Sequence, residues 1–218
     1  MGEPLWPNLR REGRELYTRN ADPGRSVYGE ERREFGGVEY RQFDPWRSKL
    51  AAYILRDGVP PGLERVRRVL YLGGAHGTTV SHLTDLLPGV PIFVVEKSPT
   101  SFAALLALAR ARPTVLPILA DAHLPERYRA DVGPVDLIYQ DVAQRDQAAL
   151  FAENALACLR RGGEGLLMLK LRSVTQRRPV GELLRETRQL LAGQSLRVAA
   201  TVDLAPFARE HAALRVVA

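Results

Sequence analysis

Short apolar runs and amphipathic stretches alternate along the chain from residue 47 onward. The runs are nearly all apolar, which is typical of strands buried on both faces of a sheet. The amphipathic stretches carry their apolar residues at helical spacing. The predicted strands are Val69–Leu72, Ile92–Val95, Val115–Leu119, Val135–Tyr139, Leu166–Leu169, Leu196–Val202 and Ala212–Val217, and the predicted helices are Ser48–Leu55, Thr79–Leu87, Thr100–Arg110, Gln144–Leu159 and Val180–Leu191.

This alternation predicts an α/β fold, a doubly wound sheet with helices on both faces. Five strand–helix units followed by a final strand pair suggest seven strands in the order 3-2-1-4-5-7-6, with the last strand antiparallel. Pro117 lies inside the third predicted strand. Because proline cannot donate to a sheet ladder, it belongs on an edge strand, and the third strand is the edge in this order. The helix Val180–Leu191 places Val180, Leu184 and Leu191 on one face and ends at Gly193, a suitable C-cap.

Residues 1–46 have a different pattern, with frequent Gly and Pro between short extended stretches. The stretches are Glu15–Arg19, Arg25–Tyr28 and Val38–Arg41. We interpret this region as a small β-rich N-terminal subdomain with tight turns, and residues 47–218 as the main domain.

Composition restricts the class of protein. Among 218 residues no run approaches the roughly 20 apolar residues that span a bilayer, and the N-terminus lacks the apolar core of a secretory signal. Cys158 is the only cysteine, which excludes an internal disulfide and suits a reducing, cytoplasmic location. No histidine has partners at metal-ligand spacing, so we expect no metal site. The net charge of +6 permits a polyanionic partner, but solubility explains it equally well.

Polar and glycine residues follow the first four strands of the predicted main sheet. In an open α/β sheet ligands bind at these carboxyl ends, where an acid after the second strand can accept both ribose hydroxyls of an adenosine. The candidates are Gly73, Gly74, Ala75, Gly77, Thr78 and Thr79 after the first strand, Glu96 and Lys97 after the second, Asp121 and Ala122 after the third, and Asp141, Val142, Ala143 and Gln144 after the fourth. The hydroxyls of Thr78 and Thr79 can cap the next helix or bind the ligand.

These positions favour a ligand that contains adenosine, either S-adenosylmethionine or a dinucleotide. The glycine run is neither a clean G-x-G-x-x-G nor a P-loop. The repeated acids favour S-adenosylmethionine, because its sulfonium is cationic and carries no phosphates.

Lysine is rare in this chain. Only Lys49, Lys97 and Lys170 occur among 31 basic residues, so lysine marks positions where arginine would not serve. Lysine is a compact donor whose pKa can shift, whereas arginine stays charged. Lys170 ends a buried strand and is a candidate functional residue by itself.

Three segments resemble the fibrillarin family, the guide-RNA-directed rRNA 2′-O-methyltransferases. They are Val69–His82, with Leu72-Gly73-Gly74-Ala75-His76-Gly77 at its centre, then Asp141-Val142-Ala143-Gln144, and Arg47-Ser48-Lys49-Leu50-Ala51-Ala52. The resemblance extends from Pro23 to Ala212 and, without a Gly/Arg-rich tail, fits the short archaeal form. It implies a class I methyltransferase (Rossmann-like) sheet and S-adenosylmethionine as cofactor. The chain departs from the family pattern at His76, Lys97 and Glu210.

By resemblance, the family's catalytic set falls on Lys49, Asp141, Lys170 and His211. A ribose 2′-hydroxyl must lose its proton as it attacks the methyl group. A desolvated lysine near other cations can act as the base or stabilise the developing alkoxide. We expect Lys170 to make this contact, Asp141 to orient it, and Lys49 and His211 to complete the network. Without the resemblance, Lys49 and His211 would be interpreted as ordinary solvated residues.

The resemblance also implies partners. They are a box C/D-type guide RNA, the target rRNA or tRNA, a Nop-type scaffold protein and a kink-turn-binding protein. Arg172, Arg177 and Arg178 follow Lys170, and we expect them to contact RNA phosphates. Three alternatives stay open: a methyltransferase acting on a base or a protein side chain, a nicotinamide oxidoreductase, and a non-catalytic RNA-binding scaffold.

Overall fold

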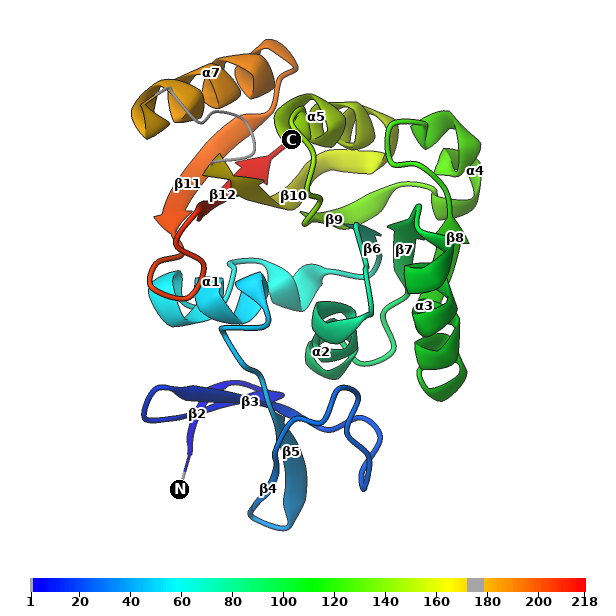
Figure 1. Cartoon of the computed structure of the whole chain (residues 1–218), viewed down its shortest axis with the longest axis vertical. Coiled ribbons are helices and arrows are strands. Elements are labelled where there is room, and N and C mark those ends of the chain that lie inside the picture. Colours follow the sequence, from blue (N-terminus) through cyan, green and yellow to red (C-terminus); the bar gives the residue numbers. More distant parts are fainter. Residues whose placement is uncertain (1, 172–178) are drawn as a thin grey trace.

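A computed structural model describes residues 2–171 and 179–218 (Figure 1). Its main sheet has seven strands in the order β11-β12-β10-β9-β6-β7-β8, which confirms the predicted order. Neighbouring strands are parallel except that β12 runs antiparallel to both β10 and β11. The strands are β6 Val69–Leu72, β7 Ile92–Glu96, β8 Val115–Leu119, β9 Val135–Gln140, β10 Leu159–Lys170, β11 Arg197–Asp203 and β12 His211–Val217.

Pro117 lies on the edge strand, as predicted. It sits in β8, and the register pairs it with Val94 of β7. With no strand on its other side, β8 needs no ladder hydrogen bond from this residue.

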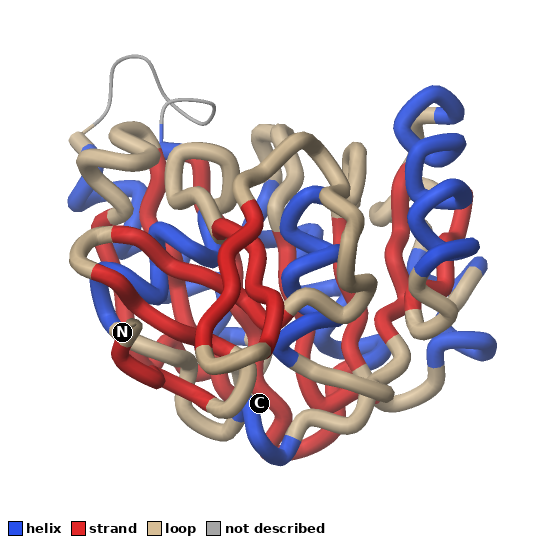
Figure 2. Tube along the Cα trace, turned by 90° about the horizontal axis from the view of Figure 1, so that it is seen from below, coloured by secondary structure: helices blue, strands red, loops and turns tan. Residues whose placement is uncertain are grey.

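Helices cover both faces of the main sheet, as Figure 2 also shows from below. Tyr71 faces the first group of helices, whereas Leu70 and Leu72 face the second. This alternation explains why the strand sequences are apolar throughout. The first group is α1 Lys49–Asp57, α2 Thr78–Leu86 and α3 Pro99–Ala111, the second is α4 Arg129–Val132, α5 Gln147–Cys158 and α7 Val180–Gly193, and single 3-10 turns lie at Leu63–Arg65 and Pro125–Arg127. None of the helices in the described part of the chain is long and apolar enough to cross a membrane.

Some boundaries differ from the prediction. The strand β10 begins at Leu159 rather than Leu166, through a bulge in its pairing with β9. The apolar pattern did not predict this extension, because three of the added residues are glycines, which are uncommon in strands. Glycine is needed at position 165, since a Cβ there would lie 2.3 Å from the Phe151 ring. Val180 is exposed rather than on the buried face of α7, and Gly193 is the last helical residue, with Gln194 as the C-cap.

The N-terminal region forms a separate antiparallel sheet with the strand order β1-β2-β3-β5-β4. Its strands are β1 Glu3–Trp6, β2 Leu9–Glu12, β3 Glu15–Arg19, β4 Arg32–Phe35 and β5 Val38–Gln42. The prediction of an extended stretch at Arg25–Tyr28 is wrong. The N–H groups of Val27 and Tyr28 instead donate to the Glu30 carboxylate at 2.9 and 2.8 Å, which closes a turn.

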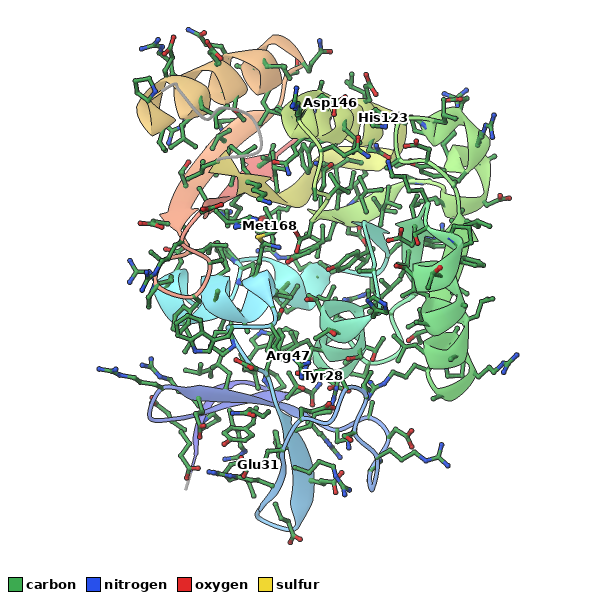
Figure 3. The ribbon with its side chains drawn as sticks, in the orientation of Figure 1. Tyr28, Glu31, Arg47, His123, Asp146 and Met168 are labelled. Atoms are coloured by element: carbon green, nitrogen blue, oxygen red, sulfur yellow. The ribbon has the colours of Figure 1, made fainter. Side chains whose placement is uncertain are left out.

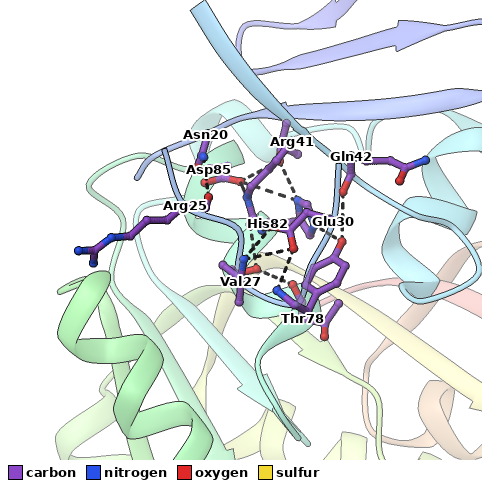
Figure 4. A network of polar contacts seen from close by, with 12 residues as sticks. Asn20, Arg25, Val27, Glu30, Arg41, Gln42, Thr78, His82 and Asp85 are labelled. Atoms are coloured by element: carbon purple, nitrogen blue, oxygen red, sulfur yellow. Dashed lines mark hydrogen bonds and ion pairs between the residues drawn. The ribbon is translucent and has the colours of Figure 1, made fainter. Parts of the chain in front are cut away.

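A buried polar network joins this small sheet to α2 (Figure 4). Arg41 of β5 donates to Glu30 at 2.7 Å and to Asp85 of α2 at 2.6 Å, with all three side chains almost fully buried. His82 of α2 bonds to Thr18 and Tyr28, both at 2.7 Å. The apolar core is also continuous between the two regions, so the division of the chain at residue 46 stays a prediction.

Candidate active site

Two adjoining pockets lie at the carboxyl ends of β6, β7 and β9. Their volumes of about 330 and 400 Å³ are in the range of small-molecule sites. They share Gly73, Ala75, Asp141, Val142 and Ala143. The first also has Glu96, Lys97, Ala122 and Gln144 in its wall, and the second has Arg47, Lys49, Gly74, His76, Thr78, Thr79, Lys170 and His211.

The glycine loop between β6 and α2 is shaped by close approach of neighbouring segments. Gly73 has φ +83°, and a Cβ there would lie 2.5 Å from the Asp141 carbonyl oxygen. A Cβ on Gly74 would lie 2.2 Å from Val94. Neither threonine caps the helix: α2 begins at Thr78 after Gly77, without a side-chain cap, and the Thr79 hydroxyl bonds to Ser48 at 2.9 Å.

Glu96 is the last residue of β7 and forms the wall of the first pocket that faces the glycine loop. Its carboxylate accepts from the Ala75 N–H at 2.9 Å and from the Ser98 N–H at 2.8 Å. These bonds hold the glycine loop at a set distance from β7. Each carboxylate oxygen has a second lone pair for a ligand hydroxyl.

Asp121 is not in the wall of either pocket, although Ala122 is. Its carboxylate instead accepts from the His123 backbone N–H and meets the His123 Nδ1 at 2.8 Å. The other ring nitrogen of His123 lies 2.9 Å from Asp146. Figure 3 labels both residues. The two carboxylates raise the pKa of His123. This bridge ties the loop after β8 to the loop before α5.

Lys49 and Asp141 form an ion pair between segments that are 92 residues apart. The Nζ of Lys49 lies 2.7 Å from each carboxylate oxygen, and the two side chains are 25% and 23% exposed. Lys49 is the first residue of α1, after the N-cap Ser48, while Asp141 directly follows β9. We expected Asp141 to orient Lys170, but both of its oxygens contact Lys49.

Lys170 and His211 are direct cross-strand partners in β10 and β12. Residues opposite each other in an antiparallel pair point to the same face, so both side chains reach the second pocket. Burial, with the nearby Lys49 charge, lowers the pKa of His211 to about 4. The imidazole is therefore neutral at pH 7 and has a lone pair that can accept a proton.

Gln147 connects these segments and was missed by the sequence interpretation. Its buried side chain accepts a hydrogen bond from the Lys170 N–H at 2.8 Å and donates one to the Val142 carbonyl. The backbone carbonyl of Gln147 accepts a hydrogen bond from the Gln140 side chain at 2.7 Å. One amide thus fixes the ends of β9 and β10 relative to each other. A signal was available, because Gln147 stands four residues before Phe151 on the apolar side of a predicted helix.

Arg172, Arg177 and Arg178 lie outside the described residues. Within the described ranges, no group of three or more His, Cys, Asp or Glu side chains could hold a metal ion.

The strand order, the glycine loop and the carboxylate ending β7 define a class I methyltransferase fold. The Fibrillarin family matches residues 6–218, so the chain belongs to the fibrillarin family. The chain is 43% identical over 204 residues to the fibrillarin-like rRNA/tRNA 2′-O-methyltransferase of Methanosarcina barkeri, covering 92% of this chain and 90% of that one.

Solved structures agree with this assignment. The Aeropyrum pernix fibrillarin with natively bound S-adenosyl-L-methionine superposes with a TM-score of 0.88 and 37% identity, over 97% of this chain and 95% of that one. The fibrillarin of a fibrillarin/Nop5p complex has a TM-score of 0.84 and 37% identity, over 98% and 99% of the two chains.

Proposed function

We propose that this protein transfers a methyl group from S-adenosylmethionine to ribose 2′-hydroxyls of rRNA and tRNA. One observation carries the proposal: Lys49, Asp141, Lys170 and His211 meet in a pocket that adjoins the pocket containing Glu96. The pocket with Lys49, Lys170 and His211, the second pocket, supplies the groups that a hydroxyl needs when it attacks and releases its proton. The pocket with Glu96, the first pocket, suits an adenosine. The names of the curated relatives support the same reaction.

The first pocket fits S-adenosylmethionine. A Cβ on Gly73 would collide with the Asp141 carbonyl oxygen, and one on Gly74 would collide with Val94, so both glycines let the loop pack closely beside the pocket. Glu96 lies in the pocket wall as a hydroxyl acceptor. Lys97, Ala122, Val142, Ala143 and Gln144 of the first pocket, with Thr78 and Thr79 of the second, complete the proposed cofactor site. Gly77 and Asp121 lie outside both pocket walls and would shape the site from behind: a Cβ on Gly77 would lie 2.7 Å from Leu108, and Asp121 is paired with His123. When bound, the cofactor supplies an electrophilic methyl group on a positively charged sulfur.

The second pocket contains the proposed catalytic groups. Lys170 contacts the 2′-hydroxyl and stabilises the negative charge that develops on its oxygen. His211 beside it is neutral and can take up a proton at its ring nitrogen. The Asp141 carboxylate offsets the Lys49 charge and holds that ammonium at the wall. Much of the rate comes from keeping hydroxyl and methyl in line.

The proposed setting is a box C/D-type particle. The Nop5p complex of the similar structure supports a Nop-type scaffold partner. A guide RNA would supply sequence specificity, and a kink-turn-binding protein would complete the particle. Arg172, Arg177 and Arg178 remain proposed phosphate contacts. The single cysteine, Cys158, is free and buried, which is consistent with the proposed cytoplasmic location.

Reconstitution tests the proposal. The chain is assembled with a Nop-type protein, a kink-turn-binding protein and a guide RNA, and the product is digested with alkali. An alkali-resistant linkage at the guided nucleotide is expected, because a methylated 2′-oxygen cannot attack the phosphate. Methylation of a base or a protein would contradict the proposal.

Lys170→Ala tests the mechanism. We expect it to abolish methyl transfer while affinity for S-adenosylhomocysteine, measured by calorimetry, stays within a few-fold. Arg185→Ala, on an exposed part of α7, is the matched control. Wild-type turnover in Lys170→Ala would end the catalytic assignment.

The cofactor is tested by thermal unfolding with S-adenosylhomocysteine and with NAD. A ligand at 100 times its dissociation constant adds about 2.7 kcal/mol to the free energy of unfolding. Stabilisation by S-adenosylhomocysteine alone, reduced in Glu96→Ala, is expected. Stabilisation by NAD alone would favour an oxidoreductase.

A further inference from the structure

An exposed tryptophan, Trp46, directly precedes Arg47, which forms part of the wall of the second pocket. The side chain of Trp46 is 64% exposed, and its ring meets Phe207 edge-on at 5.2 Å. Its backbone N–H donates to the Asp44 carboxylate at 2.8 Å, which fixes the turn that presents it. The indole thus packs against Phe207 on one side, and most of its surface stays open to solvent.

The two loops that meet at this aromatic pair lead directly into two proposed catalytic groups, Lys49 at the start of α1 and His211 at the start of β12. Trp46 lies three residues before Lys49, and Phe207 lies four residues before His211. Figure 1 shows the β11–β12 loop beside α1. The aromatic pair therefore joins the segment that leads into Lys49 to the segment that leads into His211.

A cation stands next to the tryptophan. Arg47 is exposed and forms part of the wall of the second pocket. Its guanidinium lies 5.0 Å from the Tyr28 ring centre, and Nη1 donates to the Tyr28 carbonyl at 3.4 Å. Figure 3 labels the two residues. Tyr28 is itself fixed, since its hydroxyl bonds to Gln42 and His82. Arg47 is thus oriented before any ligand arrives.

An open aromatic face beside an oriented guanidinium matches the chemistry of a nucleotide, which offers a flat base and a phosphate. Single exposed apolar residues are common and need no explanation by themselves. Trp46 differs because Arg47, which follows it, lies in the wall of the second pocket, and because its contact with Phe207 joins the segments that lead into Lys49 and His211.

We infer that Trp46 and Arg47 form a nucleotide-binding subsite for the substrate RNA strand. The indole stacks on an unpaired base next to the nucleotide that presents its 2′-hydroxyl, and Arg47 contacts a phosphate of the same strand. The inference rests on the proposed function, because it takes RNA as the substrate. It assigns the positioning of the strand to residues outside the proposed catalytic set.

Photo-cross-linking tests the stacking directly. In separate substrate RNAs, 5-iodouridine replaces the target nucleotide or either neighbour, and each RNA is irradiated in the assembled particle. We expect mass spectrometry to find a cross-link on Trp46 with one of the neighbours. Trp46→Ala should lose this cross-link, while Leu156→Ala, a similarly exposed residue on α5, should keep it.

Kinetics and salt dependence give two further readouts. We expect Trp46→Ala to raise the KM for substrate RNA about 10-fold, more than it lowers kcat, and Trp46→Phe to recover most of the loss. Arg47→Gln should reduce the slope of log affinity against log salt by about one phosphate contact. A KM increase in Trp46→Ala, with no cross-link on Trp46 in the wild-type particle, would contradict stacking.

Three results would overturn the inference: cross-links only at other residues, an unchanged KM in Trp46→Ala, or loss of the Nop-type protein from the Trp46→Ala particle. The last would make the indole a protein anchor. If the wild-type particle methylates no ribose, the proposed function fails, whereas the cross-link still decides the subsite.

Discussion

Two clusters of charged side chains in this protein are built from similar residues but differ in what surrounds them. In the network beneath the N-terminal sheet, Arg41 and Asp85 have fully buried side chains. In the pocket at the sheet edge, Lys49 and Asp141 stay about one quarter exposed. Both clusters join segments that are far apart in the sequence.

The number of partners explains the difference in role. Asp85 accepts hydrogen bonds from Arg41, Arg112, Thr18 and the Ala21 N–H, so no lone pair faces a ligand. Within the described residues, Lys49 is the charged partner of Asp141, which forms part of a pocket wall beside Lys170 and His211. A saturated buried network fixes the fold, whereas a partly solvated cluster leaves groups available for chemistry.

Breaking the saturated network should have the largest effect on stability. Asp85→Ala leaves the buried Arg41 and Arg112 without their shared carboxylate and should lower the free energy of unfolding by about 3–5 kcal/mol. Chemical denaturation measures this. The control Arg25→Ala removes a long, exposed ion pair to Asp22 and should cost less than about 1 kcal/mol. Equal effects of the two variants would contradict the comparison.

Breaking the partly solvated cluster of Lys49 and Asp141 should leave the fold almost unchanged but stop the reaction. Lys49→Ala removes a partly solvated pair, so the free energy of unfolding should fall by less than about 1 kcal/mol. Methyl transfer should fall at least ~100-fold, about 2.7 kcal/mol in the activation free energy. A loss of stability as large as in Asp85→Ala would show that Lys49 is mainly structural.

Gln147 combines features of the two clusters. It is buried like Arg41 and Asp85, but it connects the strand ends that position Asp141 and Lys170. Gln147→Leu should lower the free energy of unfolding by about 1–3 kcal/mol, since the Lys170 N–H and the Val142 carbonyl lose their partner. Methyl transfer per folded molecule should also fall, by about 10-fold. Unchanged turnover in the folded fraction would limit Gln147 to a structural role.

The smallest expected effect concerns pH. NMR titration should give His211 a pKa of about 4, rising in Lys49→Ala because a nearby positive charge is removed. His82 should stay neutral as the pH falls, because burial lowers its pKa far below 6.5. A His211 that titrates near 6.5 in the wild-type chain would contradict its proposed neutral, buried state.

These shifts also set the sign of the stability change. His82 and His211 have lowered pKa values, so below pH 6.5 the unfolded chain binds protons that the folded chain does not. Each contributes a loss of up to about 1.4 kcal/mol per pH unit as the pH falls, for His211 down to about pH 4. His123 opposes this, because its raised pKa stabilises the fold as the pH falls through that value.

The sequence by itself determined the main sheet. The apolar runs of β6 and β8 were predicted with their observed bounds, and Pro117 marked the edge strand, because burial on both faces and a missing N–H are local properties of the chain. Lys170, a rare lysine at the end of a buried strand, was a candidate functional residue from the sequence by itself, whereas Lys49 became one only through the family resemblance, and the catalytic roles of both stay proposals.

Only the tertiary structure decided which distant residues meet. The turn at Arg25–Tyr28 depends on the Glu30 carboxylate, and the Arg41–Asp85 pair on packing of the small sheet against α2. Gln147 was passed over because its partners lie on two strand ends, one of them 23 residues away. Local periodicity records whether a side chain is buried, but a polar group's partners are fixed by the packing of separate elements, which no local pattern contains.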